Sequence, residues 1–243
     1  QHVKKRDLGY DTNNLIQLNS SRDLNTNFEA FRNDLQQAGI SSSVVRTSGP
    51  LTTILGFTSG IQWPGAAVNS ELIVGFLFAD KDFAKTLNAK MIEGRDFRQG
   101  DSNSVIFNKE AIRLMNISSP VGKQINWAGK QRTIVGVVDN MVMTSPYAAA
   151  SPMMVCYDDR RSSFTNIRLT EKTDLRKALT TIEGIHKKYS PEYPFEYRFI
   201  DDEFNRKFIN EQLIGKLAVI FAGLSIFVCC LGLFGLVSFT IER

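Results

Sequence analysis

Residues 215–243 read GKLAVIFAGLSIFVCCLGLFGLVSFTIER, and from Leu217 to Ile241 this stretch contains no charged residue. Twenty-five residues of helix measure about 37 Å, which exceeds the hydrocarbon core of a bilayer, about 30 Å thick. A helix buried in a soluble protein normally keeps a polar face, and this stretch has none. Lys216 precedes it and Glu242–Arg243 follows it, as expected of charges at two membrane interfaces. The sequence therefore predicts a transmembrane helix over residues 217–241.

The helical pattern begins well before this apolar segment. In DDEFNRKFINEQLIGKLAVIF (201–221), Phe204, Phe208 and Leu213 lie near helical spacing, and no proline or turn cluster interrupts them. We therefore expect one continuous helix of about 40 residues, about 60 Å long. Residues 201–216 would form a stalk outside the membrane, with Phe204 and Phe208 packing the stalk against the rest of the protein.

Small residues recur inside the apolar segment. Ala218 and Ala222 form a small-xxx-small pair, and Gly232 and Gly235 lie three residues apart. Small side chains let neighbouring membrane helices approach closely. We expect these four residues to pack against other membrane helices.

The composition of the whole chain is that of a folded protein. The 243 residues are 43 % hydrophobic and 10 % aromatic, which excludes a disordered chain. The net charge of +4 is spread along the sequence, so nucleic acid is not an expected partner. Cys156 is the only cysteine before the apolar segment, so no disulfide framework is available. Because the chain starts at Gln1 and stops just after an apolar helix, we expect a piece of a longer membrane protein.

Two strand–helix–strand units stand at the two ends of the hydrophilic part. The first comprises NLIQLNS, TNFEAFRNDLQQAG and ISSSVVRTS between residues 14 and 48, with Thr26 and Glu29 as a capping box for its helix. The second comprises FTNIRLT, DLRKALTTIEGIHKKYS and YPFEYRFID between residues 164 and 201. About 110 residues of mixed strands and helices separate them. This order predicts an α+β protein in which one domain is split by an inserted domain.

Within the central part, two local features carry predictions. ELIVGFLFA (71–79) is typical of a buried strand, and the short helix after it would be capped by Asp80 or Asp82. EGRDFRQGD (93–101) lacks the alternating oxygen ligands of a calcium loop, so we expect a turn in which Arg95 pairs with a neighbouring carboxylate.

Catalytic and metal-binding patterns are missing from the sequence. His2 and His186 are the only histidines, and no cluster has the spacing of a zinc site. SPVGKQI contains Gly-Lys without the remainder of a P-loop, and no G-x-S-x-G elbow occurs. A Ser-His-Asp triad would have to use His186, which we expect on an exposed helix face. We therefore predict no catalytic, metal or cofactor-binding residue, and a protein that is not itself an enzyme.

Several stretches follow one another at the spacing of a known family. These are DFAKTLNAKMIEGRDFRQGD (82–101), SVIFNKEAIRLM (104–115), SPVGKQI (119–125) and RTIVGVVDN (132–140). LGYDTNNLIQL (8–18) resembles the start of that family's domain after a membrane helix, and YRFIDDEFNRKF (197–208) resembles its end. CLGLFGLVSFTIER (230–243) resembles the membrane helix that opens an FtsX-like permease region. Together they resemble the MacB-like periplasmic core domain over essentially the whole chain, although residues 51–69 match none of its motifs.

The resemblance implies a division of the chain. Residues 1–11 would connect from a preceding membrane helix, and residues 12–49 with 160–200 would form a porter-like domain. Residues 50–159 would form the inserted, mixed α/β sabre-like domain. The stalk helix (201–216) and the transmembrane helix (217–241) would follow.

The resemblance also implies a function. Members are permease subunits of ABC transporters, in which ATP hydrolysis by a separate ATPase moves a large extracytoplasmic domain and drives export or extraction of a substrate. The implied partners are that ATPase, a second permease copy or paralogue, and the lipid bilayer, with no cofactor. Residues 1–216 would then be mainly periplasmic on a bacterial inner membrane. The transported substrate, homo- or heterodimer formation, and a periplasmic or outer-membrane partner remain open.

A membrane receptor, such as a sensor kinase, is the competing interpretation. Such a receptor also has an α/β ligand-sensing domain between two membrane helices, and a long helix connects this domain to the cytoplasmic side. The sequence beyond Arg243 discriminates the two, because a receptor continues into a heptad-bearing helical segment and a permease into further membrane helices.

Overall fold

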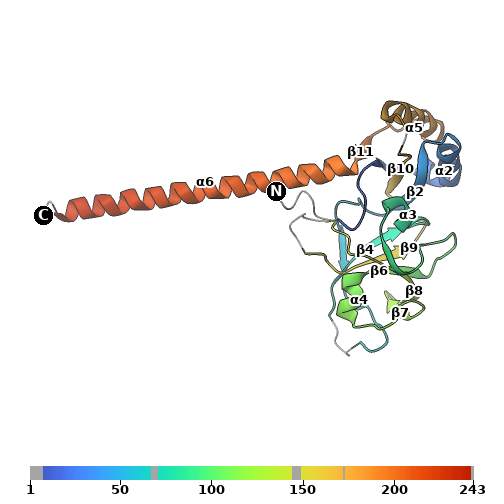
Figure 1. Cartoon of the computed structure of the whole chain (residues 1–243), viewed down its shortest axis with the longest axis horizontal. Coiled ribbons are helices and arrows are strands. Elements are labelled where there is room, and N and C mark those ends of the chain that lie inside the picture. Colours follow the sequence, from blue (N-terminus) through green and yellow to red (C-terminus); the bar gives the residue numbers. More distant parts are fainter. Residues whose placement is uncertain (1–7, 67–70, 144–148, 172, 242–243) are drawn as a thin grey trace. The chain divides into compact units, whose positions relative to one another are not determined.

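The computed structural model describes residues 8–66, 71–143, 149–171 and 173–241 (Figure 1). The chain divides into two compact units, Gln1–Glu203 and Phe204–Arg243. We call the first the domain and the second the C-terminal unit, and each is described by itself.

The described residues of the domain form one eleven-stranded mixed sheet, in the order β11-β1-β10-β2-β4-β9-β6-β8-β5 with β3 beside β4 and β7 beside β8. The strands are β1 (Leu15–Asn19), β2 (Ser41–Thr47), β3 (Gly56–Thr58), β4 (Val74–Ala79), β5 (Met91–Gly94), β6 (Ser104–Asn108), β7 (Gln124–Trp127), β8 (Lys130–Val138), β9 (Met153–Tyr157), β10 (Phe164–Leu169) and β11 (Tyr197–Phe199). The helices are α1 (Arg22–Thr26), α2 (Phe28–Gln37), α3 (Phe83–Leu87), α4 (Lys109–Met115), α5 (Leu175–Tyr189) and α6 (Ile200–Ile241).

Helices cover both faces of the sheet around β1, β10 and β2. Side chains of successive strand residues point to opposite faces of the sheet, so two neighbouring residues pack in two different apolar clusters. Val44 of β2 packs in one cluster with residues of α2 and α5, whereas Val45 packs in another with residues of α3. α2 and α5 lie side by side on the first face (Figure 1). This part of the sheet is therefore a three-layer sandwich.

A third cluster fills the part of the sheet made by β4 and β6–β9. Phe107 of β6 and Trp127 of β7 lie in it with Ala111 of α4. Phe76 and Phe78 contact the Trp127 ring, with ring centroids 5.4 and 6.2 Å away. Aromatic contacts around Trp127 thus form part of the packing of this half.

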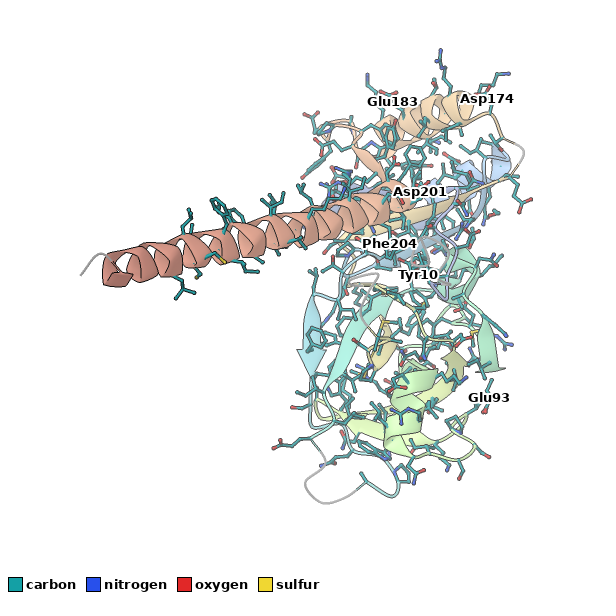
Figure 2. All side chains as sticks on the ribbon, turned by 60° about the vertical axis from the view of Figure 1, so that its left-hand side comes forward. Tyr10, Glu93, Asp174, Glu183, Asp201 and Phe204 are labelled. Carbon is teal, nitrogen blue, oxygen red and sulfur yellow. The ribbon has the colours of Figure 1, made fainter. Side chains whose placement is uncertain are left out.

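The two parts of the sheet join at β2 and β4, whose pairing register contains a single pair, Thr47 with Ala79. A shared apolar cluster reinforces this joint, because Val45, Leu77 and Ile106 all belong to it. Tyr10 is also buried there, and its hydroxyl donates to the Leu51 carbonyl (3.1 Å; Figure 2). The joint has few strand hydrogen bonds and is held mainly by side chains.

The predicted α+β class and most predicted elements are confirmed, but the helix after β1 starts differently. The predicted capping box at Thr26 is wrong: Thr26 is the last residue of α1, and its hydroxyl donates to the Arg22 carbonyl (3.0 Å). Ser21 caps α1 by accepting from the Leu24 N–H (3.0 Å). Asn27 then separates α1 from α2, so two helices replace the single predicted one.

The C-terminal unit consists of helix α6 from Phe204 onward, and the predicted continuity of this helix is confirmed from Ile200 to Ile241. Among the described residues, Leu213–Leu233 is a helix segment long and apolar enough to cross a membrane, and its side chains are exposed. Exposure of so many apolar side chains is unfavourable in water and favourable in lipid. The segment is therefore a candidate membrane span.

Candidate functional site

A buried cluster of charges occupies the joint between β2 and β4. Asp80 directly follows β4 and is 2 % exposed. Its Oδ2 accepts from Arg32 Nη2 of α2 (2.9 Å) and from Arg46 Nε of β2 (3.1 Å). Its Oδ1 accepts from the backbone N–H of Arg46 (2.8 Å). One carboxylate thus connects a helix and both strands of the joint.

The two arginines share an aromatic partner. The guanidinium carbons of Arg32 and Arg46 lie 4.7 and 4.1 Å from the centroid of the Phe28 ring. Burial raises the pKa of Asp80, while the charges of Arg32 and Arg46 oppose that rise. Because two guanidinium groups donate to it, the carboxyl group holds this cluster in its ionised form. Removing the Asp80 carboxylate would leave two buried guanidinium groups without their shared anion.

The helix after β4 was predicted to be capped by Asp80 or Asp82. Asp82 is the N-cap residue of α3, but its side chain makes no capping hydrogen bond. Asp80 binds Arg32 and Arg46 instead. The helical spacing does contain a signal for the cluster: Arg32 lies four residues after Phe28 on the buried face of α2. A charge on an apolar helix face requires a buried partner, and an aspartate directly after a buried strand supplies one.

The ion pair predicted in the 93–101 turn is confirmed, although Glu93 and Gly94 belong to β5 and the turn begins at Arg95. Arg95 donates to Asp101 through both terminal nitrogens, at 2.6 and 3.1 Å. Burial raises the pKa of Asp101, but hydrogen bonds from Arg95 and from the Arg98 N–H outweigh burial and hold the pKa below its ordinary value. A Cβ on Gly136 would lie 2.4 Å from the Arg95 carbonyl oxygen, so glycine is required where this turn crosses β8.

His186 was expected on an exposed face, and the structure corrects this. Its side chain is buried on the inner face of α5 and stacks near Phe195, with ring centroids 5.5 Å apart. Burial lowers its pKa, which favours the neutral imidazole. Among the described residues, no group of three or more His, Cys, Asp and Glu side chains could hold a metal ion.

The residues predicted for stalk and membrane packing lie along α6. Phe204 is half-buried (Figure 2), and Ala218, Ala222 and Gly232 are exposed. The side chain of Phe208 and the surroundings of Gly235 lie outside the described residues. Nothing in the described part of the chain brings these residues into a common site, so their packing roles stay predictions.

A comparison with protein families places most of the chain in one of them. The model of the MacB-like periplasmic core domain matches residues 5–185. No curated protein matches the chain.

Solved structures are also similar to the chain. The periplasmic region of MacB from Actinobacillus actinomycetemcomitans aligns with a TM-score of 0.55 at 12 % identity, over 85 % of this chain and 97 % of that structure. The extracellular domain of the noncanonic ABC-type transporter YknZ from Gram-positive bacteria aligns with a TM-score of 0.49 at 15 % identity, over 76 % and 98 %. At such identities a likeness concerns the fold alone, whereas the family model covers most of the sequence. The chain belongs to the MacB-like periplasmic core domain family, the periplasmic domains of MacB/FtsX-like ABC transporter permeases.

Proposed function

We propose that this chain transmits mechanical work in an export-type ABC permease. In this proposal, ATP hydrolysis by a separate cytoplasmic ATPase shifts the membrane helices, and α6 carries that shift to the periplasmic domain. The domain then changes conformation to export or extract a substrate. Family membership favours this role over the receptor alternative.

The observation that carries the proposal is the direct passage from sheet to helix. β11 pairs with β1, with Tyr197 opposite Leu18 and Phe199 opposite Ile16, and α6 begins at the very next residue. Ile200, its first residue, is fully buried in the core of the domain. α6 contains no proline, the commonest cause of a sharp kink. A continuous helix that starts in the core of the domain is suited to transmitting force.

The predicted division into a porter-like domain (12–49 and 160–200) and a sabre-like insertion (50–159) remains part of this proposal. Two facts support it. The strands β11, β1, β10 and β2 are neighbours in the sheet, and the strands from β3 to β9 form the remainder. The two groups meet only through the Thr47–Ala79 pair among strand pairings of the described residues. The Asp80 cluster would then fasten one part to the other.

The proposed partners follow from the same role. They are an ABC ATPase, a second permease copy or paralogue, and the lipid bilayer of the bacterial inner membrane. Ala218, Ala222, Gly232 and Gly235 would contact neighbouring membrane helices. Phe204 and Phe208 would pack the stalk against the domain.

Interrupting α6 at the boundary of the two units tests force transmission. About seven Gly/Ser residues inserted between Glu203 and Phe204 should act as a flexible joint, whereas a helix-forming insert of equal length, about two turns, should keep the rod. The permease–ATPase complex would be placed in lipid nanodiscs. Hydrogen exchange of residues 8–203 would be compared with and without a non-hydrolysable ATP analogue.

The two inserts should differ in this experiment. We expect the nucleotide-dependent change in exchange to disappear with the flexible insert and to persist with the helical one, while ATPase activity continues in both. An unchanged nucleotide response in the flexible variant would refute transmission through α6.

Charged substitutions test the stalk residues. Phe204→Glu and Phe208→Glu should each weaken the nucleotide-dependent exchange change severalfold, because a charge at either position opposes the proposed packing of the stalk against the domain. Assembly with the ATPase, measured by co-purification, should be retained. Leu213→Glu, on the same helix but inside the candidate membrane span, should instead impair membrane insertion. A normal nucleotide response in both phenylalanine variants would remove them from the mechanism.

A further inference from the structure

A second polar region lies at the end of the sheet where β9 ends and β6 and β8 begin. It is a cavity of about 290 Å³ whose walls include Lys130, Arg132, Tyr157, Asp158, Asp159 and Arg160. The turn before β6 closes one side, because the Gly100 N–H donates to the Tyr157 hydroxyl (3.2 Å). The Arg95–Asp101 ion pair holds that turn in place. The cavity therefore has a fixed wall.

Arg132 is buried in this cavity without a polar partner. The residue is 7 % exposed, its buried Nε has no hydrogen-bond partner, and its side chain makes no hydrogen bond or ion pair with the described residues. On β8 it pairs with Ile125 of β7, so its side chain shares a face with Trp127. Its guanidinium carbon lies 5.5 Å from the centroid of the Trp127 indole. This contact orients the guanidinium but leaves its buried Nε without a hydrogen-bond acceptor.

The other deeply buried arginines of the described chain are all paired. Arg32 and Arg46 bind Asp80. Arg168 donates to the backbone carbonyls of Asp11 (2.6 Å), Thr86 (2.9 Å) and Asn13. A buried charge without a partner is unfavourable by several kcal/mol. Arg132 is the exception, so its donors are available to a group from outside the chain.

The neighbouring charges define what that group can be. Lys130 and Arg160 add positive charge to the cavity, while Asp158 and Asp159 add negative charge. Asp158 is already engaged, because it accepts from the Arg160 N–H (2.9 Å) and lies 3.5 Å from Arg161 Nε. Two nearby carboxylates repel a dianion more strongly than a monoanion. A planar monoanion that accepts two hydrogen bonds from a guanidinium fits best.

We propose that the Arg132 cavity is a binding site for a carboxylate group, carried by a small organic acid or by the end of a polypeptide. The carboxylate accepts hydrogen bonds from Arg132, with Lys130 and Arg160 at the rim. This site does not depend on the proposed force transmission by α6, and its test is separate from the test of that function.

Fluorescence of Trp127 is a direct probe, because the guanidinium stands over its indole. The chain has two tryptophans, so a Trp63→Phe background isolates the signal. The chain in detergent micelles would be titrated at low salt with acetate, triglycine, triglycinamide and phosphate. Arg132→Met tests the site, Arg132→Lys keeps its charge, and Arg113→Met removes an exposed, ion-paired arginine on α4 as the control.

We expect a saturable fluorescence change with acetate and triglycine that triglycinamide does not produce. Affinity should fall about tenfold or more in Arg132→Met, less in Arg132→Lys, and not at all in Arg113→Met. Equal affinities for acetate and triglycine indicate a free acid as the ligand, and tighter triglycine binding indicates a polypeptide end. Calorimetric titration of the unmodified chain provides the same comparison should Trp63→Phe unfold.

Three results would overturn the assignment. The first is the absence of saturable binding of acetate and triglycine. The second is carboxylate binding that persists in Arg132→Met. The third is phosphate binding as tight as that of acetate.

Discussion

Two regions of the domain bury arginine side chains, and they differ in whether a carboxylate pairs with the guanidinium. At the joint between β2 and β4, Arg32 and Arg46 converge on Asp80 and stack on Phe28. At the far end of the sheet, Arg132 stacks on Trp127 and has no anion of its own. Both regions give the guanidinium an aromatic face, but only the joint supplies a carboxylate. Aromatic stacking positions a guanidinium, and the counter-charge decides whether it stabilises the fold.

The presence of a carboxylate partner distinguishes a structural role for buried arginine from a binding role. In the joint, both guanidinium groups already have Asp80 as their anion, although Arg32 Nε has no hydrogen-bond partner. An unpaired buried charge destabilises the folded chain unless an external anion compensates it. The joint is therefore suited to holding two groups of strands together, and the Arg132 cavity is suited to recognition.

The largest effect is expected from removing the shared carboxylate of the joint. Asp80→Ala leaves Arg32 and Arg46 buried without an anion, which should lower the free energy of unfolding by about 3–5 kcal/mol. Urea unfolding of the chain in detergent, followed by tryptophan fluorescence, measures the loss. Glu29→Ala is the matched control, because Glu29 pairs with Arg32 and Lys81 from a half-exposed position and should contribute less than about 1 kcal/mol. Equal losses in both variants would show that the joint is not a closed cluster.

The next prediction compares the stability of two variants, each with one buried arginine replaced by methionine. Arg46→Met removes one of the two cations on Asp80 and should lower the free energy of unfolding by about 3 kcal/mol. Arg132→Met removes an unpaired buried charge and keeps an apolar stem over Trp127, so the free energy of unfolding should rise rather than fall. The same urea experiment distinguishes them. A loss in Arg132→Met as large as that in Arg46→Met would mean that Arg132 is a structural residue.

Local patterns in the sequence were enough to predict most of the sheet and α6. Strands such as β1 and β8 and the helix Ile200–Ile241 follow from alternation, helical spacing and hydropathy, all of which act within a few residues. The α1–α2 boundary was missed because Ser21 and Thr26 are equally plausible caps in sequence, and the choice depends on tertiary packing.

The charged clusters could not be predicted in the same way. Asp80 is separated in sequence from Arg32 by 48 positions and from Arg46 by 34, so no local spacing predicts these ion pairs. His186 was placed on the wrong face because α5 buries Ala178 and Ile182 and leaves Leu175 exposed, a rotation of the helix that its apolar residues alone do not specify. Arg132 lies in a correctly predicted strand, but its burial depends on the hairpin that brings Trp127 over it. Long-range pairing, rather than local propensity, creates both regions.

The smallest effect concerns the wall of the Arg132 cavity. The pKa of Asp101 in the folded chain is below its ordinary value, mainly because the hydrogen bonds from Arg95 and the Arg98 N–H outweigh burial. Its contribution to stability is therefore complete above the ordinary pKa and is lost as pH falls through the lowered one. Arg95 is about one-third exposed, with 35 % of its side chain accessible, so the contribution should stay below about 1 kcal/mol.

Urea midpoints of the unmodified chain and of Asp101→Asn, compared from about pH 6 to about pH 3, measure this dependence. The difference between the two proteins should shrink as pH falls. Burial raises the pKa values of Asp80 and Asp96, so their contributions change with the opposite sign, but they occur in both proteins and cancel. A difference that stays constant over this range would mean that Asp101 does not hold the wall through its charge. The cavity would then depend on the Gly100–Tyr157 hydrogen bond alone, and Tyr157→Phe should weaken carboxylate binding more than Asp101→Asn does.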